Sequence, residues 1–320
     1  MPGKQPTRQW APTELPRMRR ELVRAAEEAA DRAVNDPAVD ARFPVPGDRF
    51  ADRVASTDPG LARDIRSRTI HRGRSTADLE RRHALHLQAA ELYWVTREMT
   101  RVALDASTDM PPWTPSAVIP VPIGLLIWAE DLPGVVWRTH DRSPLVPVDG
   151  VFWVQSGERV ELTVLTRTDR AITEGHLSSR RAPFITVHSL MIKADELNTD
   201  DVDRYQAGLV AAIGATWTLM QMPTVAAARQ VTGAGGSGPQ WRRDNRRISI
   251  IDLRRRATQT GMTATGGREY KHRWYVRGHW RQQPHGPAHA LRRPTWIPGH
   301  IKGPAGAPLL AVERVYVWRR

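Results

Sequence analysis

The chain contains no cysteine, and this absence excludes several kinds of site. Without thiols there is no disulfide framework, no thiol nucleophile and no zinc site built on thiolates. Long apolar runs are missing too. The longest, residues 119–129, is about half the length of a membrane-spanning helix, and Pro120 and Pro122 interrupt it. The first ten residues (MPGKQPTRQW) lack the apolar core of a secretory signal, so we expect a cytoplasmic protein without a membrane partner.

Several familiar active-site motifs are also missing. The sequence contains no G-x-S-x-G, no H-E-x-x-H and no dinucleotide-binding fingerprint. The Gly-rich segment TGAGGSG at 232–238 lacks the G-K-[ST] ending of a phosphate-binding loop, and its composition is that of a flexible linker. We therefore expect no cofactor, apart from Mg²⁺ in one alternative considered below.

Lysine is scarce throughout the chain, whereas acidic residues are scarce in one region only. Four of the 47 basic residues are Lys. The net charge of +13 is concentrated in residues 229–320, which hold 19 basic and 4 acidic side chains, while residues 1–228 hold 28 and 30. A region with that excess attracts polyanions by electrostatic steering and by the release of counterions. The sequence therefore predicts DNA or RNA as a partner.

The first two-thirds of the chain has the pattern of an α+β domain, which we place at residues 14–231 after a disordered tail at 1–13. Helical periodicity predicts helices over 14–36, 77–106 and 200–222. Runs rich in β-forming residues lie between the last two, at 123–128, 135–139, 150–155, 160–166 and 184–192. The expected fold class is α+β, with N-terminal helices, a mixed α/β core and then a small, basic, β-rich C-terminal module.

That C-terminal module is predicted over residues 247–320, after a Gly/Arg-rich linker at 232–246. It lacks a helical pattern, and Pro and Gly are dense between 284 and 308. Its strand candidates are 247–254, 270–282, 294–301 and 311–319.

The run WYVRGHWR, residues 274–281, is the most informative stretch of the module. In a strand, successive side chains point to opposite faces. One face would carry Trp274, Val276, Gly278 and Trp280, and the other Tyr275, Arg277, His279 and Arg281. The first set suits a buried face, and each Trp is also explained by simple core packing. The second set is a cationic row with an aromatic ring at its end, as in proteins that bind single strands by stacking bases.

From this pattern we predict a nucleic-acid-binding surface. Arginine binds phosphate oxygens in pairs and stacks on bases, and clusters of it flank the cationic row. The predicted binding residues are Arg254, Arg255, Tyr275, Arg277, His279, Arg281, Arg292, Arg293 and Lys302. DNA and RNA, and single and double strands, remain open. A solvated basic surface is the plain alternative for the Arg clusters.

A nuclease is the first functional alternative. A metal-free ribonuclease needs a base, an acid and a cation at the scissile phosphate, and His279, Arg281 and His285 supply those types, with Lys302 or His300 as substitutes. A Mg²⁺-dependent nuclease would instead use Asp252 and the carboxylate of Glu269-Tyr270-Lys271. His285 and His289 have the spacing of a metal pair, but Pro287 between them disfavours a helix, so we predict no metal site there.

An interaction protein is the second alternative. In it, residues 14–231 dock a protein partner, and the basic module binds the acidic surface of that partner.

The tail also carries three short motifs: R-G-H-W-R-x-Q, R-x-x-W-I and K-G-P. With them, residues 247–320 resemble the C-terminal segment of uncharacterised proteins carried by actinobacterial plasmids and phages. The resemblance implies a role on a mobile genetic element, and it implies no particular activity or site residue.

Overall fold

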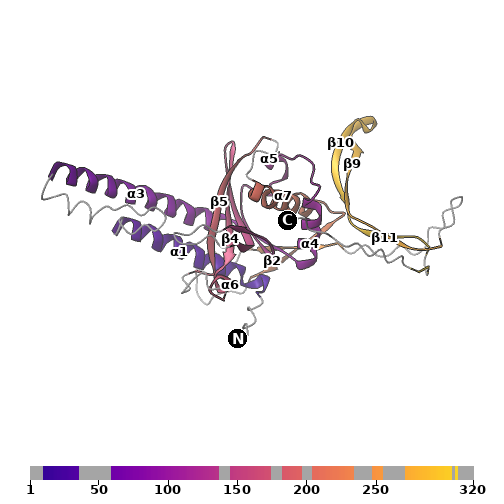
Figure 1. Cartoon of the computed structure of the whole chain (residues 1–320), viewed down its shortest axis with the longest axis horizontal. Helices are drawn as coiled ribbons and strands as arrows, with labels where there is room; N and C mark the ends of the chain where they lie inside the picture. The colour runs from indigo at the N-terminus through magenta and orange to yellow at the C-terminus, as the bar shows by residue number, and fades with distance from the viewer. Residues whose placement is uncertain are drawn as a thin grey trace. The chain divides into compact units, whose positions relative to one another are not determined.

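The structure is a computed structural model of the chain, and it describes residues 10–35, 59–136, 145–173, 182–196, 204–233, 247–254, 271–304 and 307–308. Helices and a mixed sheet build an α+β fold, as the sequence predicts (Figure 1). Its residues form two compact units. Unit 1 comprises residues 1–95, 121–194 and 230–250, and unit 2 comprises 96–120, 195–229 and 251–320.

A seven-stranded sheet organises unit 1. Its order is β5-β4-β3-β2-β1-β7-β6, with β1 and β2 parallel and β2 to β5 antiparallel. The strands are β1 (Glu91–Val95), β2 (Ile123–Val136), β3 (Leu145–Ser156), β4 (Arg159–Arg167), β5 (Phe184–Lys193), β6 (Ala226–Thr232) and β7 (Arg247–Leu253). β6 begins in unit 2 and ends in unit 1, whereas β7 begins in unit 1 and ends in unit 2. In β3, residues 148–154 are all buried, so the side chains on both faces of this strand are shielded from solvent.

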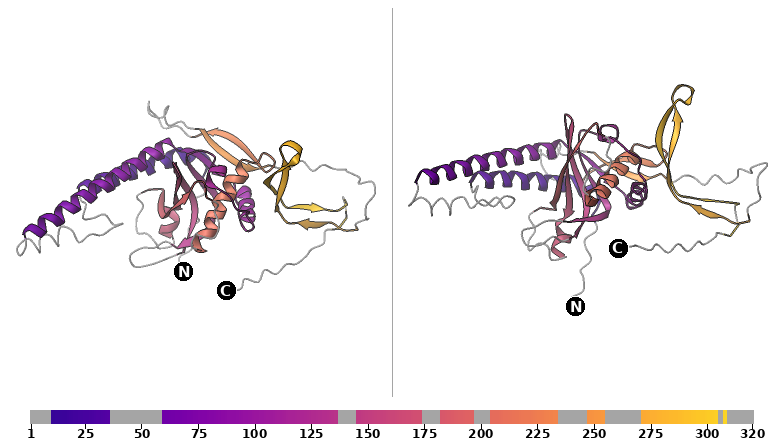
Figure 2. Two further views of the ribbon diagram at one scale, coloured as in Figure 1. Left: turned by 90° about the horizontal axis from the view of Figure 1, so that it is seen from above. Right: turned by 45° about the horizontal axis from the view of Figure 1, so that its top comes forward.

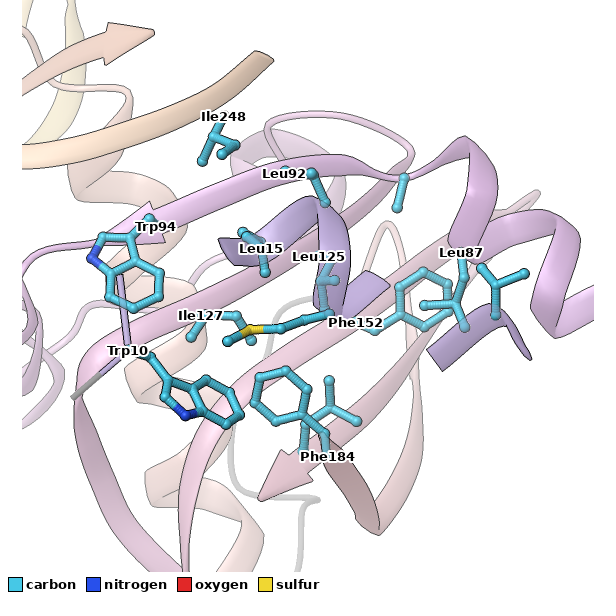
Figure 3. Close-up of a cluster of buried hydrophobic side chains, with 14 of the residues drawn as sticks. Trp10, Leu15, Leu87, Leu92, Trp94, Leu125, Ile127, Phe152, Phe184 and Ile248 are labelled. Carbon is cyan, nitrogen blue, oxygen red and sulfur yellow. The ribbon is translucent and has the colours of Figure 1, made fainter. Parts of the chain in front are cut away.

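The main core of unit 1 lies between this sheet, the start of α1 (Leu15–Asn35) and the end of α3 (Pro59–Ala89) (Figure 3). Trp10 packs edge-on against Phe184, with ring centroids 4.8 Å apart. The two helices lie side by side and extend away from the sheet (Figure 2). Arg19 is buried between them and the sheet, and its guanidinium donates a hydrogen bond of 3.3 Å to the carbonyl oxygen of Ala90.

The helix predicted over 77–106 is correct at both ends, but it is wrong as one continuous helix. α3 ends at Ala89, β1 follows, and α4 (Arg97–Ser107) begins after Thr96. Leu79 and Leu85, two of the apolar residues whose periodicity predicts the helix, are 60% and 63% exposed. The run ELYWV explains the difference. Its last four residues are buried in a strand that pairs with β2, and a short apolar run of this kind is compatible with a strand as well as with a helix.

Unit 2 contains α4, the short α5 (Pro115–Val118) and the apolar α7 (Arg204–Met220). Trp113 packs edge-on against Trp217 of α7, and Gly214 makes room for it, since a Cβ there would lie 2.4 Å from the Trp113 ring. The predicted helix over 200–222 is confirmed for the described residues from Arg204 onward. Remaining short helices are η1 (Pro12–Glu14), α6 (Thr168–Thr173) and η3 (Pro287–His289).

Two antiparallel strand pairs complete unit 2. One joins β9 (His279–His285) to β10 (Leu291–Ile297), and the other joins β8 (Trp274–Val276) to β11 (His300–Lys302). The predicted strand over 247–254 is confirmed as β7, but it lies in the seven-stranded sheet and not among the strands of the basic module. The linker residues 234–246 and the predicted strand over 311–319 lie outside the described residues.

Candidate nucleic-acid interface

The predicted strand over 270–282 consists of two strands, with a break at Arg277 and Gly278. β8 ends at Val276 and β9 begins at His279, and each pairs in a different sheet. Gly278 allows the break to pack closely, because a Cβ at this position would lie 2.4 Å from the Trp296 ring and 3.0 Å from a carboxylate oxygen of Asp105. Any larger residue would displace the indole.

The predicted alternation of faces survives this break. Tyr275, Arg277, His279 and Arg281 are exposed, whereas Trp274, Val276, Gly278 and Trp280 are buried or half-buried. Local periodicity therefore gives the correct outward set even though the strand is interrupted.

Two tryptophans anchor the base of the β9–β10 hairpin. The Trp280 Nε1–H donates a hydrogen bond of 2.9 Å to the carbonyl oxygen of Ala106 in α4. The Trp280 and Trp296 rings pack edge-on with centroids 5.3 Å apart, and Trp296 is 2% exposed. These side chains are structural, as simple core packing predicts, and they hold one face of the hairpin base against the body of unit 2.

The register divides the remaining hairpin side chains between two faces. Residues directly opposite each other in an antiparallel pair point to the same side. Arg281 lies opposite Thr295, and Gln283 lies opposite Arg293, so these four share one face, which we call the cationic face. His279 with Ile297 opposite it, and His285 with the exposed Leu291 opposite it, belong to this face as well. The other face carries Trp280 and Trp296 at the base and Arg292 near the tip.

The tip of the hairpin is a tight turn. Gly286 has φ 75° and ψ −176°, a conformation open essentially only to glycine. Ala288 and His289 follow with φ of 51° and 56°, in the left-handed region. Residues 286–290 are all exposed.

The segment 271–304 contains seven basic residues, five His and no acidic residue. No described carboxylate pairs with Arg281, Arg292 or Arg293, and all three side chains are exposed. Arg277 differs, because its guanidinium contacts the Asp105 carboxylate at 3.1 Å and donates to the Thr108 hydroxyl at 3.0 Å. The charge of Arg277 is thus partly neutralised by a carboxylate of the same chain.

Tyr275 and Lys302 belong to the β8–β11 pair and so lie on a different sheet from the cationic face. Tyr275 is 62% exposed and lies opposite Ile301, which is 53% exposed. Lys302 lies opposite Trp274. The sequence predicts that Tyr275 and Lys302 share one binding surface with Arg281. In the structure, Tyr275 and Lys302 belong to the β8–β11 pair and Arg281 to the β9–β10 pair.

Arg254 lies elsewhere in unit 2, beside a pocket of about 300 Å³ lined also by Ala227, Arg229, Asp252 and Leu253. Its guanidinium donates to the Pro223 carbonyl. The Asp252 carboxylate accepts hydrogen bonds from the Thr96 hydroxyl and the Leu253 amide, both 3.1 Å long. Arg255 and Glu269 lie outside the described residues.

The candidate catalytic histidines lie at opposite ends of one strand. His279 begins β9 and His285 ends it, with Arg281 between them. At about 3.4 Å per residue the two rings are separated by roughly 20 Å, too far for both to reach one scissile phosphate. Nδ1 of His279 lies 3.3 Å from the Arg277 carbonyl oxygen. Among the described residues, no three His, Asp or Glu side chains form a metal-binding group.

Gln283 and Thr295 are not among the binding residues predicted from the sequence, but the register places both on the cationic face. The signal for them was present. Two β-compatible runs, 279–285 and 291–297, are separated by five residues that include Gly286 and Pro287, the pattern of a hairpin with a longer loop. Placing strands at 270–282 and 294–301 concealed that pairing.

Comparison of the sequence with protein-family models and with curated proteins finds no match. In the part of the chain that the structure describes, no helix is both long enough and apolar enough to cross a bilayer.

Proposed function

We propose that this protein binds nucleic acid through the β9–β10 hairpin, in the service of a mobile genetic element. The observation that carries the proposal is the charge of segment 271–304, where seven basic residues are accompanied by no acidic residue. Three of those cations, Arg281, Arg292 and Arg293, project from the hairpin with no described carboxylate beside them. The resemblance of the tail to proteins of plasmids and phages supports the mobile-element setting.

Electrostatics explains why such a hairpin would bind a polyanion. Each Lys or Arg that neutralises a phosphate releases condensed counterions, and this release supplies most of the affinity for non-specific sites. Arginine forks also form paired hydrogen bonds with phosphate oxygens. Because α4 anchors the hairpin base through Trp280, its cations are held on a preformed support and lose little entropy on binding.

The proposal does not require catalysis. The separation of His279 and His285 along β9 argues against a metal-free nuclease that uses both on one phosphate. In the experiment below, cleavage with Mg²⁺ would indicate a nuclease that uses Asp252. Absence of binding to every probe would favour a basic surface for an acidic protein partner.

The test uses the full chain, freed of bound nucleic acid by nuclease treatment and a high-salt wash. Labelled DNA and RNA of about 25 nucleotides, single- and double-stranded, are titrated between 50 and 200 mM salt with EDTA or Mg²⁺. One variant removes three hairpin charges (Arg281→Ala, Arg292→Ala and Arg293→Ala). A charge-matched control removes three exposed cations of unit 1 (Arg63→Ala, Arg82→Ala and Arg159→Ala).

We expect wild-type affinity to fall steeply with salt, and the hairpin variant to lose at least about tenfold in affinity with a shallower salt slope. The control variant should bind within about threefold of wild type. Absence of binding to every probe, or equal losses in both variants, would contradict the proposal. Cleavage of a probe only with Mg²⁺ would point instead to the Asp252 alternative.

A further inference from the structure

The shape of the β9–β10 hairpin restricts the kind of nucleic acid that it fits. It is a two-stranded ribbon with seven residues in each strand, and its tip stands clear of the helices of unit 2 (Figures 1 and 2). Its strands lie about 4.8 Å apart, so with side chains the ribbon is on the order of 10 Å wide. The major groove of B-form DNA is about 12 Å wide and admits such a ribbon.

Four side chains of the cationic face are of types that recognise base edges. Arg281 and Arg293 can each donate two hydrogen bonds to guanine O6 and N7, and Gln283 can pair in the same way with adenine N6 and N7. Thr295 can contact a base edge or the thymine methyl group. All four lie on the side of the ribbon opposite the Trp280 and Trp296 rings, so anchoring of the base to α4 leaves this face open.

Single-stranded recognition fits the hairpin less well. Proteins that bind single strands stack successive bases on exposed aromatic rings. On the hairpin, both tryptophans pack against each other at the base and Trp296 is almost fully buried. Apart from the two imidazoles, the described cationic face presents no ring to a base.

Strand addition by a partner protein is also disfavoured. Pro284 lies in β9 and Pro294 in β10, and each strand is an edge. Proline lacks the N–H that an added strand requires, and proteins use it to protect sheet edges against pairing.

We infer that the β9–β10 hairpin inserts into the major groove of duplex DNA, with Arg281, Gln283 and Arg293 directed toward the base edges. The inference rests on the proposed function and adds the class of ligand and the side of the hairpin that contacts it. Arg292, on the opposite face, points away from the bases in this arrangement.

The first experiment compares affinities of the full chain for three probes of one sequence: a 25-base-pair DNA duplex, its single strand and an RNA duplex. We expect the DNA duplex to bind at least about fivefold more tightly than either alternative, because the major groove of A-form RNA is too deep and narrow for side chains to enter. Equal or tighter binding of the single strand or the RNA duplex would overturn the inference while leaving nucleic-acid binding intact. Failure to bind any probe would remove the proposed function itself.

The second experiment identifies the groove. Dimethyl sulfate methylates guanine N7 in the major groove and adenine N3 in the minor groove, so one reagent reports on both. At saturating protein we expect protection of guanine N7 and not of adenine N3. Protection confined to adenine N3 would overturn the inference.

Matched variants then test the face. The double variant Arg281→Ala/Arg293→Ala should lose at least about tenfold in duplex affinity, together with the guanine N7 protection. Arg292→Ala, which removes one charge from the other face of the same ribbon, should weaken duplex binding less than the double variant does and should keep the protection. Both variants change exposed side chains, and near-ultraviolet circular dichroism checks that the Trp280–Trp296 pair is unchanged. An Arg292 effect equal to that of the double variant would contradict the assigned face.

Discussion

The arginines at the end of β4 and in α6 of unit 1 have surroundings opposite to those of the arginines in the β9–β10 hairpin of unit 2. Arg170 contacts the carboxylates of Asp131 at 2.9 Å and Asp149 at 3.0 Å, and its side chain is 17% exposed. Arg167 contacts Asp169 at 2.7 Å and lies over the Trp10 ring, 4.3 Å from its centroid. On the hairpin, Arg281 is exposed, and no described carboxylate pairs with it.

This difference separates two uses of one residue type. A sheltered arginine between carboxylates fixes the chain locally, and removing it leaves a buried negative charge without a partner. An exposed arginine without a carboxylate contributes little to stability, but its field is available to an external anion. Arg277 is intermediate, since it is half exposed and paired with Asp105. Stability and nucleic-acid binding should therefore respond to different substitutions.

The largest effect is expected from Arg170→Ala at pH 8. Asp149, 2% exposed, would keep only the Arg167 amide as a hydrogen-bond donor, and breaking a buried pair in this way costs about 3–5 kcal/mol of the free energy of unfolding. Urea denaturation measures the loss. Arg281→Ala is the matched substitution on the hairpin and should change that free energy by less than about 0.5 kcal/mol. Similar losses of unfolding free energy in the two variants would show that the two arginines do not differ in their contribution to stability.

The second effect is a pH dependence of unfolding that originates at Asp149. Burial raises the pKa of this carboxyl to about 6, and the nearby Arg170 guanidinium only partly opposes the rise. The folded state therefore holds a proton between about pH 4 and pH 6 that the unfolded state has released, so the free energy of unfolding falls as pH rises through this window. The contribution amounts to about 3 kcal/mol.

The isosteric variant Asp149→Asn isolates that contribution. Its amide oxygen can still accept the hydrogen bond from the Arg167 amide, and Arg170 keeps Asp131. Relative to this variant, the wild type should lose stability from pH 4 to pH 7, as followed by urea denaturation across the series. Parallel curves for the two proteins would show that Asp149 is not the source.

Sequence reasoning succeeded where the determinant is local and failed where it is distant. The alternation of exposure along 274–281 follows from strand geometry alone, and it was correct in spite of the break at Gly278. The division of α3 from α4 was missed, because residues 92–95 suit a helix until β2 is placed beside them. β7 was recognised as a strand from its isoleucines, but its neighbour β1 lies about 150 residues earlier in the chain.

The candidate site shows the same division. The excess of arginine and the absence of acids in 271–304 are visible in the sequence, and so is the cationic row. The pairing of Arg277 with Asp105 is not visible, since the two residues are separated by 172 positions. Which residues form the cationic face depends on the β9–β10 register, because only the pairing of the two strands brings Arg281 and Arg293 to the same side.

The third effect concerns the bend that joins β8 to β9. In Gly278→Ala the new methyl group would collide with the Trp296 ring, so we expect a loss of about 1–3 kcal/mol in the free energy of unfolding and weaker DNA binding as the hairpin loses its anchor. Gly208→Ala in α7 is the control from the same unit, because a Cβ there meets nothing within 4 Å and alanine favours helix. Urea denaturation and duplex titration measure both variants. Equal behaviour would show that the Trp296 contact is dispensable.

The smallest effect on global unfolding is expected at the hairpin tip, where Gly286→Ala should loosen the turn and Ala288→Gly should not. Gly286→Ala places a side chain at φ 75° and ψ −176° and should destabilise the turn by about 1–3 kcal/mol, seen as faster hydrogen exchange in β9 and β10 and a few-fold weaker duplex binding. Ala288→Gly relieves a left-handed alanine at φ 51°, which offsets the entropy that glycine adds to the unfolded chain, so exchange should slow slightly or stay unchanged. Because the tip belongs to unit 2 and Asp149 to unit 1, neither change should alter urea unfolding of unit 1. If Gly286→Ala loosens the hairpin without weakening binding, a preformed ribbon is not needed for recognition.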